Sequence, residues 1–273
     1  MRIIYDEWGQ MCNRLWQYID QVAWAMKNNE KVVSLFWDPS LNDFDNLRNN
    51  PYIKFPLYIR VFQKGKTGDL YRRTLIKLLH NHVVQGIFAK PFFQKHGFVN
   101  SNTIMFRHEY YPEVWEQEKG LFAPSTAIAE RIDAEFDHCR QNSTGKIVGI
   151  HLRKGDYKDY YDGFYYYEDE EYADFMRQMV KLLGEDTYFF IASNEKIDKD
   201  HFKDFHMMDS HNTKAAEDMY CLSKCDYIMG PFSTFSGWAS FYGQVPYYYF
   251  RRKAKITLSD FHIIQFMTRP PKE

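Results

Sequence analysis

The segment IVGIHLRKGDY, from Ile147 to Tyr157, decides the fold. Its first six residues predict a buried strand of the kind found inside parallel sheets. His151 and Arg153 alternate along the segment and therefore share one face, and the strand breaks at Gly155. In open α/β sheets, ligands bind at the carboxyl ends of the strands. The segment therefore predicts both a parallel sheet and a polar site at its edge.

The α/β pattern continues toward the C-terminus. The predicted elements are helices at 171–183, 215–225, 236–243 and 258–267, and strands at 187–193, 206–209, 226–230 and 245–250. Strands that alternate with helices in this way predict parallel pairing.

The N-terminal half begins with a second α/β unit. Strands at 2–5 and 32–37 enclose a helix that starts at Asn13, which predicts a βαβ unit. Between 38 and 122 only Thr74–Val84 is predicted to be helical, and a helix follows at Ser125–Arg140. The polar run QNSTG then predicts a boundary. We expect an α/β fold with domains at 1–143 and 144–257, followed by a helix and tail at 258–273.

Composition excludes several functional classes. The 273 residues include 35 basic and 36 acidic ones, so the net charge of −1 provides no global basic field for nucleic acid or an anionic membrane. There is no apolar signal region and no membrane-spanning run, so we expect a cytoplasmic protein without integral membrane contact. The four cysteines form no zinc pattern. Cys221 and Cys225 are predicted to be core thiols.

Two segments could hold a phosphate. The guanidinium of Arg153 has a planar fork of donors suited to phosphate, and His151 could add a hydrogen bond or a positive charge. The alternative is that Arg153 and Asp156 form a local ion pair that closes the turn. Ser233 to Ser236 precede a predicted helix, where hydroxyl and backbone N–H groups can bind an anion. Ordinary helix capping is the alternative there. A weaker third segment is the glycine loop at Gly9, which lacks GxGxxG spacing.

Taken together, these segments resemble glycosyltransferase family 11, the α-1,2-fucosyltransferases. HLRKGDY is similar to the HxRRxD motif of the wider fucosyltransferase group, with Lys154 in place of the second arginine. The run EDMYCLSKCDYIMGPFSTFSGWASF resembles the C-terminal signature, with Phe232 where asparagine is common. GQMCNRLWQY resembles GxxGNxxFQYA, with Cys12 in place of the second glycine. YFFIASNE resembles a strand that ends in Ser-Asp-Asp.

The resemblance implies a GT-B architecture, with two Rossmann-like domains that face a cleft, and transfer of L-fucose from GDP-fucose to a glycan with inversion and without a metal. It implies that Arg153 grips the β-phosphate beside His151, and that Asp209 reads the guanine. The nucleotide would also contact Gly9 and Asn13 in the glycine loop and Ser233, Thr234, Phe235 and Ser236 in the turn. No cofactor is expected beyond the donor substrate.

The transfer needs a base for the acceptor hydroxyl. Glu7 and Asp6 follow the first strand and Asp156 ends the arginine turn; Glu7 is slightly favoured over Asp156, and solvated loop acids are the alternative. The Asp198-Lys199-Asp200 sequence formally matches a metal-binding DxD, but its place after a polar turn favours surface charge. Competing functions are transfer from another GDP-sugar and a non-catalytic nucleotide-sugar or glycan-binding module.

Aromatic residues make up 18% of the chain. Seven of the 21 tyrosines lie between Tyr157 and Tyr172, interleaved with the seven acidic residues from Asp156 to Glu171. Because sugars stack on aromatic faces and hydrogen-bond to phenols and carboxylates, this segment is the candidate acceptor surface. We expect it to be a wet, partly mobile wall; a solvated loop is the alternative.

Overall fold

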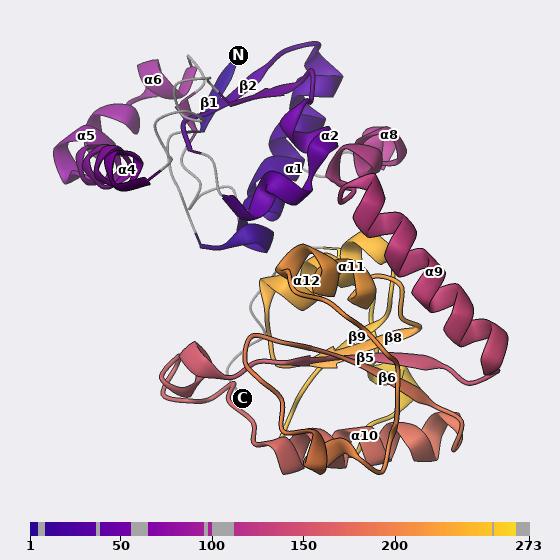
Figure 1. The fold of residues 1–273 in the computed structure, drawn as a ribbon. Helices are drawn as coiled ribbons and strands as arrows, with labels where there is room; N and C mark the ends of the chain where they lie inside the picture. Colours follow the sequence, from indigo (N-terminus) through magenta and orange to yellow (C-terminus); the bar gives the residue numbers. More distant parts are fainter. Residues whose placement is uncertain are drawn as a thin grey trace. The chain divides into compact units, whose positions relative to one another are not determined.

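A computed structural model describes residues 1–4, 9–36, 39–55, 65–95, 98–99, 112–252 and 254–265. The chain divides into two compact units, Met1–Ser125 and Thr126–Glu273 (Figure 1). The division precedes the expected boundary at 143/144, so the helix at Thr126–Asn142 groups with the second unit. This helix packs against a helix of the second unit through several residues, which is why it belongs there.

The N-terminal unit is built on a four-stranded parallel sheet in the order β3-β2-β1-β4. Its strands are β1 (Arg2–Ile4), β2 (Val32–Ser34), β3 (Ile53–Lys54) and β4 (Phe98–Val99). Its α-helices are α1 (Met11–Asn28), α2 (Asp45–Arg48), α4 (Gly65–Leu79), α5 (His82–Phe88), α6 (Pro91–Lys95) and α8 (Trp115–Lys119). Short 3-10 helices are η1 (Pro39–Asp43), η2 (Pro112–Val114) and η3 (Gly120–Phe122). The parallel register of β1 and β2 confirms the predicted βαβ unit.

Helix α1 lies on one side of this sheet and α4, α5 and α6 lie on the other (Figure 1). The helix predicted at Thr74–Val84 is in fact two helices. Helix α4 ends at Leu79, and the side chain of Asn81 accepts a hydrogen bond from the Val83 N–H to begin α5. An asparagine at this position satisfies a free N–H group of the new helix, which favours a break over continuation.

The C-terminal unit contains a five-stranded parallel sheet in the order β7-β6-β5-β8-β9. Its strands are β5 (Ile147–Leu152), β6 (Tyr188–Ser193), β7 (His206–Met207), β8 (Tyr227–Gly230) and β9 (Tyr247–Tyr249). Its α-helices are α9 (Thr126–Asn142), α10 (Asp169–Leu183), α11 (Ala215–Leu222) and α12 (Thr234–Gly243). The 3-10 helices are η4 (Gly155–Lys158), η5 (Lys199–Phe202) and η6 (Leu258–Asp260).

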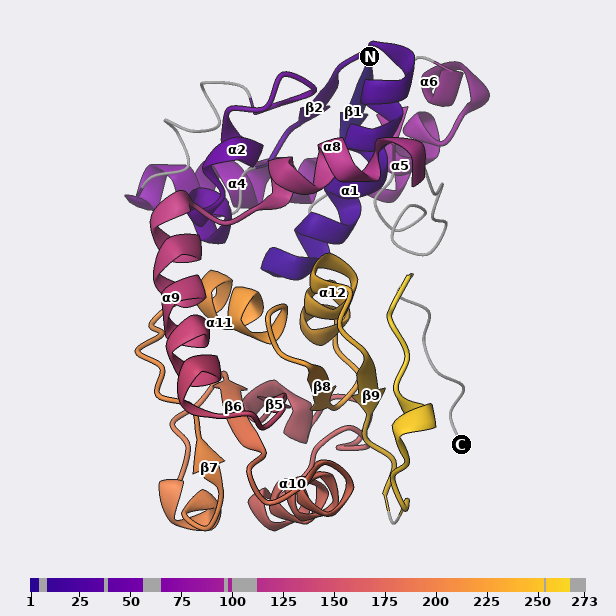
Figure 2. The same ribbon diagram turned by 90° about the vertical axis from the view of Figure 1, so that its right-hand side faces the viewer.

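Helices cover both faces of this sheet, with α11 and α12 on one side and α10 on the other (Figure 2). Gly149 on β5 allows α11 to approach, because a Cβ there would lie 2.7 Å from Leu222 and 2.9 Å from the Cys225 sulfur. Cys221 and Cys225 are buried, which confirms that they are core thiols. Apart from the terminal helix, the order of strands and helices is the predicted one, and this unit is Rossmann-like.

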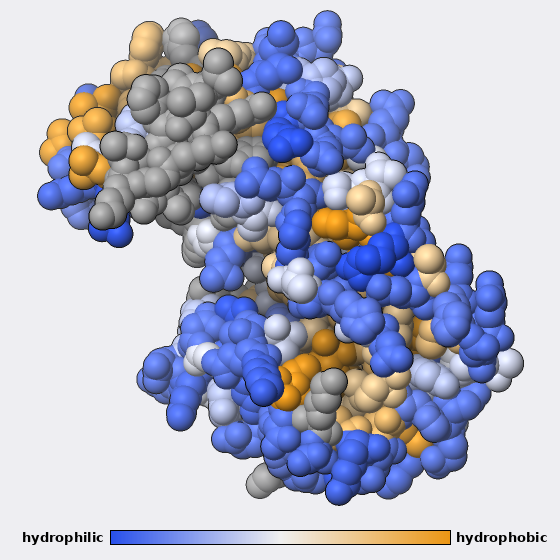
Figure 3. Space-filling view, viewed as in Figure 1, coloured by the Kyte–Doolittle hydropathy of each residue, from blue (hydrophilic) through white to orange (hydrophobic). Residues whose placement is uncertain are grey.

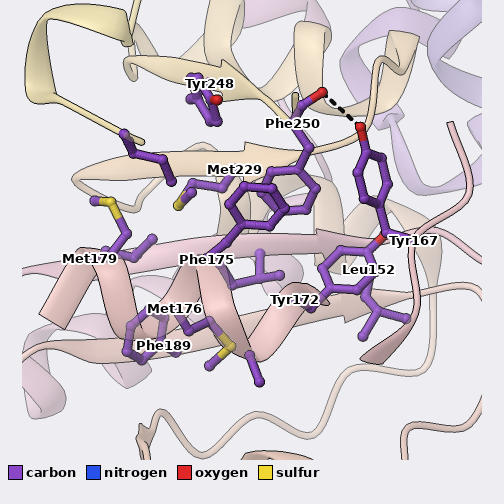
Figure 4. Packing of buried hydrophobic residues seen from close by; sticks show 14 of the residues in the cluster. Leu152, Tyr167, Tyr172, Phe175, Met176, Met179, Phe189, Met229, Tyr248 and Phe250 are labelled. Atoms are coloured by element: carbon purple, nitrogen blue, oxygen red, sulfur yellow. Dashed lines mark hydrogen bonds between the residues drawn. The ribbon is translucent and has the colours of Figure 1, made fainter. Parts of the chain in front are cut away.

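Aromatic side chains fill the core between α10 and the sheet (Figure 4). The rings of Phe175 and Phe250 stack at 4.0 Å with an interplanar angle of 7°. The hydroxyl of Tyr167 donates a 2.8 Å hydrogen bond to the Phe250 carbonyl, so a buried phenol fixes the end of β9. Part of the aromatic excess therefore serves packing.

The predicted terminal helix at 258–267 is wrong. Leu258–Asp260 is a single 3-10 turn, and His262 then pairs with Tyr247 in an isolated antiparallel bridge. Residues 266–273 lie outside the described part of the chain. The backbone of this segment bonds to the exposed edge of β9, which competes with helix formation.

Candidate functional site

The carboxyl edge of the C-terminal sheet carries the side chains that the sequence singled out. Arg153 follows β5, the Ser233–Ser236 turn follows β8, and Asp209 follows β7. Because these strands are parallel, their ends meet at the same edge. His151, near the end of β5, faces the turn directly.

His151 links the two central segments. Its Nδ1 lies 2.7 Å from the Ser236 hydroxyl, and its ring lies 5.0 Å from that of Phe235. The side chain is buried, and burial together with the Arg153 charge lowers its pKa to about 3. His151 is therefore neutral near pH 7. Of the two predicted roles, a hydrogen bond is available and a positive charge is not.

Arg153 is partly paired. Its Nη2 donates to Asp156 at 2.9 Å, so the local ion pair foreseen as the alternative does form. Its guanidinium also lies 5.2 Å from the centre of the Tyr157 ring. The Nε atom is buried, and no group in the described ranges accepts a hydrogen bond from it. A buried N–H group without an acceptor costs free energy, so an anion or a polar group that accepted a hydrogen bond from it would be stabilised here.

The turn after Arg153 requires glycine. Gly155 has φ of +56°, and a Cβ there would lie 3.0 Å from Glu195 and 3.1 Å from Asn194. The Asn194 side chain accepts a hydrogen bond from the Lys154 N–H at 3.0 Å. The end of β6 therefore fixes the turn after β5.

Lys154 does not act as a second phosphate-binding cation in this arrangement. Its ammonium group pairs with Asp169 at 2.9 Å and donates to the Tyr167 carbonyl at 2.7 Å. Burial opposes the charged form, but the hydrogen bond and charge of Asp169 outweigh it and raise the Lys154 pKa. This lysine ties the arginine turn to the start of α10.

The turn at 233–236 is a helix cap. The Ser233 side chain accepts a hydrogen bond from the Phe235 N–H at 3.2 Å, which is the ordinary capping alternative. Thr234 is the first residue of α12 and Ser236 is fully buried. The start of this ten-residue helix presents N–H groups and the positive end of its dipole at the same edge as Arg153.

Two tyrosines that sequence reasoning did not single out for this site hold its halves together. The Tyr157 hydroxyl donates to the Phe232 carbonyl at 2.8 Å, and burial raises its pKa to about 12. The Tyr247 hydroxyl donates to the Pro231 carbonyl at 2.6 Å. Both fix the β8 turn. The sequence shows an excess of tyrosine, but it does not show which tyrosines bond to the turn after β8.

Asp209 lies apart from this cluster. It lines a pocket of about 650 Å³ in the groove between α9 and β7, together with Arg131, Met207 and His211. Strand β7 is two strands from β5, and the register places Asp209 about level with Ile150 rather than Arg153, so Asp209 lies more than roughly 10 Å from the arginine turn. The structure does not bring Asp209 into contact with His151 or Arg153.

The predicted residues of the glycine loop lie in the N-terminal unit. Gly9 has φ of +63°, and a Cβ there would collide with the Asn13 side chain in the first turn of α1. These two residues are therefore adjacent. The Cys12 side chain is buried, and burial raises the pKa of its thiol. Asp6 and Glu7, the favoured base, lie outside the described residues.

The aromatic segment after Arg153 only partly meets expectation. Tyr157, Tyr165, Tyr167 and Tyr172 are buried, so a wet wall is the wrong description for those four. Tyr160 and Phe164 are 37% and 45% exposed. Their rings join those of Tyr157 and Tyr165 in one cluster. The buried rings anchor the segment and leave two aromatic faces at the surface.

Asp198, in the DxD sequence, caps the 3-10 helix η5 by accepting a hydrogen bond from the Asp200 N–H at 3.1 Å. Its carboxylate also lies 3.7 Å from His201. In the described ranges, no group of three or more His, Cys, Asp or Glu side chains is arranged to hold a metal ion.

Comparison with solved structures identifies similar folds in fucosyltransferases. The fucosyltransferase NodZ from Bradyrhizobium matches with a TM-score of 0.54 and 16% identity, over 89% of this chain and 92% of that one. NodZ α-1,6-fucosyltransferase crystallised with GDP gives 0.55 and 16%, over 91% and 94%. POFUT1 in complex with GDP-fucose gives 0.51 and 11%, over 91% and 96%. The fold is the GT-B fold of these enzymes.

Comparison with curated protein sequences finds no match. A family model, by contrast, covers residues 56–246, which include the arginine turn, the Asp209 strand and the α12 turn. More than half of the chain is therefore matched in sequence as well as in fold. The protein belongs to glycosyl transferase family 11.

Proposed function

We propose that this protein transfers L-fucose from GDP-fucose to a hydroxyl group of a glycan, with inversion and an α-1,2 linkage, and without a metal ion. The observation that carries the proposal is the buried Arg153 Nε that lacks an acceptor in the described chain, at the same sheet edge as the start of α12. The solved relatives support the donor, since NodZ and POFUT1 have been crystallised with GDP or GDP-fucose. The α-1,2 linkage rests on the sequence resemblance to the α-1,2-fucosyltransferases of this family, whereas the solved NodZ is an α-1,6-fucosyltransferase.

The chemistry follows from charge. As the bond from fucose to the β-phosphate breaks, negative charge develops on GDP. Arg153 cannot lose its proton and neutralises this charge, while the N–H groups at the start of α12 add oriented dipoles. A preorganised cation and dipoles supply the stabilisation that a metal ion provides in other transferases.

His151 contributes in its neutral form. Its bond to Ser236 holds β5 against α12, so the arginine turn and the helix start keep a fixed spacing. Asp156 orients Arg153 through their ion pair. Because its carboxylate is engaged there, the base for the acceptor hydroxyl is assigned to Glu7 rather than to Asp156. Gly9 and Asn13 are assigned to the nucleotide on the N-terminal side.

Asp209 is assigned to the guanine. A carboxylate matches the two adjacent N–H groups on that base, and the neighbouring pocket has the volume for a planar ring. A separation of more than roughly 10 Å between Asp209 and Arg153 suits an extended nucleoside diphosphate, with the base at β7 and the β-phosphate at β5.

The acceptor is assigned to the aromatic segment. Tyr160 and Phe164 present exposed rings, and Tyr160 packs on Tyr157, whose ring lies beside Arg153. Tyr161 and Asp162 have left-handed backbone conformations, a strain that clusters at binding sites. The variant Tyr160→Ala should raise the acceptor KM and leave GDP affinity unchanged. Unchanged acceptor kinetics would contradict this assignment.

The main experiment measures GDP binding by calorimetry and fucose transfer in the presence of EDTA. The variant Arg153→Ala should lower kcat roughly 1,000-fold, as the loss of a strong transition-state donor does. Arg177→Ala, which removes an exposed arginine with its own ion pairs on α10, is the matched control and should retain full activity. Preference for UDP over GDP would refute the donor assignment.

The same assay separates the competing functions. Transfer from a different GDP-sugar, with none from GDP-fucose, would keep the phosphate site and change the sugar. Binding of GDP without transfer to any acceptor in a broad glycan panel would identify a binding module. Linkage analysis of the product tests the α-1,2 assignment directly, and NMR of the anomeric proton tests inversion.

A further inference from the structure

Three short helices of the N-terminal unit expose large apolar side chains. Leu70 and Leu78 on α4 are 68% and 57% exposed, Val83 on α5 is 70% exposed, and Phe92 on α6 is 64% exposed. Apolar surface gathers over α4 and α5 in the space-filling view (Figure 3). Single exposed leucines are common, but four large ones within 23 residues of chain mark an interaction surface.

These side chains are not the ones that attach the helices to the unit. Leu75, Ile76 and Leu79 on α4 and Phe88 on α5 pack around Phe36, next to strand β2. At 3.6 residues per turn, Leu70 and Leu78 lie on the other side of α4, near Arg73 and Lys77. Helix α4 therefore has an inner apolar face for the core and an outer face that combines apolar and basic side chains.

The chain segment that contains α4, α5 and α6 also carries an excess of positive charge. Gly65–Lys95 contains six lysines and arginines and a single acidic residue, a net charge of +5. Because the whole chain carries −1, the rest of it carries −6. Arg73, Lys77, Lys90 and Lys95 are exposed. The near-zero total charge thus hides a strong local excess of positive charge.

We propose that the outer face of α4–α6, here called the basic-apolar face and defined by Leu70, Leu78, Val83, Phe92, Arg73, Lys77, Lys90 and Lys95, binds the surface of an anionic lipid bilayer. Apolar tips enter the headgroup region while the cationic side chains meet lipid phosphates. This combination is what interfacial helices use to lie on membranes.

The charge selects this occupant. A second copy of the chain would bring +5 against +5, and that repulsion disfavours self-association through this face. A bilayer with anionic lipids offers both negative charge and an apolar layer a few ångströms beneath it. In the described ranges, no helix is long and apolar enough to cross a membrane, so the contact is peripheral.

The test is co-sedimentation of the full chain with vesicles. The protein should sediment with vesicles of phosphatidylcholine that contain about one third phosphatidylglycerol, and it should stay in the supernatant with vesicles of pure phosphatidylcholine. The double variant Arg73→Gln/Lys77→Gln should weaken partitioning about 25-fold, at about fivefold per lost charge. The variant Leu78→Glu/Val83→Glu should abolish it. High salt should release the wild type.

The matched controls are on α10. Leu182→Glu changes a side chain that is 39% exposed, and Lys181→Gln removes a neighbouring exposed charge, so both should bind vesicles as the wild type does. Circular dichroism and GDP binding establish that all variants are folded. Equal binding to neutral and anionic vesicles would overturn the proposal. So would absence of binding, or a dimer in sedimentation that Val83→Glu dissociates.

Discussion

The turn after β1 and the turn after β5 occupy the same position in the two sheets, and they are built differently. Each contains a glycine with positive φ, Gly9 in one and Gly155 in the other. After Gly9 the chain enters the long helix α1 at once, and the glycine packs on Asn13 of that helix. After Gly155 comes a short 3-10 helix, and the glycine packs on Asn194 and Glu195 at the end of β6.

The difference shows where the groups proposed to bind the anion come from. In the C-terminal unit the cation is a side chain of the turn, Arg153, while the helix start comes from α12, after the neighbouring strand β8. A glycine turn after the first strand is therefore not by itself a phosphate site. Each unit also buries a titratable group whose pKa is strongly shifted, Glu118 in the first and His151 in the second.

The largest expected effect concerns the buried acid, Glu118 on α8. It is 2% exposed, and burial followed by the charge of Asp20 raises its pKa to about 9. In the native state the carboxyl stays protonated up to about pH 9, whereas in the unfolded chain it ionises once the pH exceeds its ordinary pKa of about 4.5. The free energy of unfolding therefore falls as pH rises from about 4.5 to 9. Glu118→Gln should stabilise the protein by about 3 kcal/mol at pH 7.

Thermal unfolding measured from pH 4 to pH 9 checks this expectation. The gain should vanish near pH 4, where the wild-type carboxyl is protonated in both states. Glu116→Gln, two residues earlier on the same helix and exposed, is the control and should leave the pH profile unchanged. A gain from Glu118→Gln that did not depend on pH would contradict the assigned cause.

The second effect has the opposite sign and belongs to His151. Its native pKa lies below the ordinary value, so the unfolded state binds a proton first as pH falls. Stability is full above about pH 6.5 and is lost between there and pH 3, by up to about 1.4 kcal/mol per pH unit. At pH 5 the loss is about 2 kcal/mol. His151→Gln should flatten this acid slope in denaturant titrations, while His138→Gln, an exposed control on α9, should keep it.

A third pair of variants compares the glycine turns directly. Gly155→Ala should cost about 1–2 kcal/mol and lower GDP affinity about tenfold, because a left-handed alanine beside Asn194 and Glu195 displaces the arginine turn. Gly9→Ala places a Cβ 2.1 Å from the Asn13 amide nitrogen and 2.9 Å from the Asn13 Cβ, so the start of α1 must shift. This variant leaves the arginine turn in place and should therefore lower GDP affinity less. Calorimetry measures both. Equal losses would mean that the two turns contribute equally to donor binding.

The smallest effect tests the link between the β5 and β8 turns. Tyr157→Phe removes the hydrogen bond to the Phe232 carbonyl and should cost about 1 kcal/mol of stability. The ring beside Arg153 remains, so GDP affinity should change by less than twofold. Tyr227→Phe is the matched control, at the start of β8 in the same sheet but away from this turn. A large loss of GDP affinity in Tyr157→Phe would assign the hydroxyl to the nucleotide.

Local pattern was sufficient for much of the C-terminal unit. All six residues of Ile147–Leu152 are buried, the pattern typical of a strand inside a parallel sheet. The βαβ unit at Arg2 was predicted from a strand, a helix and a second strand in close succession. The long-range partners were not predictable. Nothing in the sequence pairs His151 with Ser236, or Lys154 with Asp169, because those contacts depend on strand order and helix placement.

The errors have physical causes as well. The tyrosine-rich segment carries many acids, which suggested solvent, yet its acids point outward while rings such as Tyr172 enter the core. The helix expected at 258–267 has the apolar spacing of a helix, but hydrogen bonds from the β9 edge capture its backbone instead. The net charge of the whole chain did not predict the basic helices at 65–95, because it averages over regions of opposite sign.

The bridge between His262 and Tyr247 has a consequence for solubility. Strand β9 is the outer strand of its sheet, and an open edge of this kind can recruit a strand from another molecule. The two backbone hydrogen bonds that Tyr247 and His262 exchange occupy part of that edge. The segment that follows β9 thus hinders another molecule from adding a strand to this edge. A chain shortened before His262 should fold its sheet and then aggregate, at a rate that rises with protein concentration.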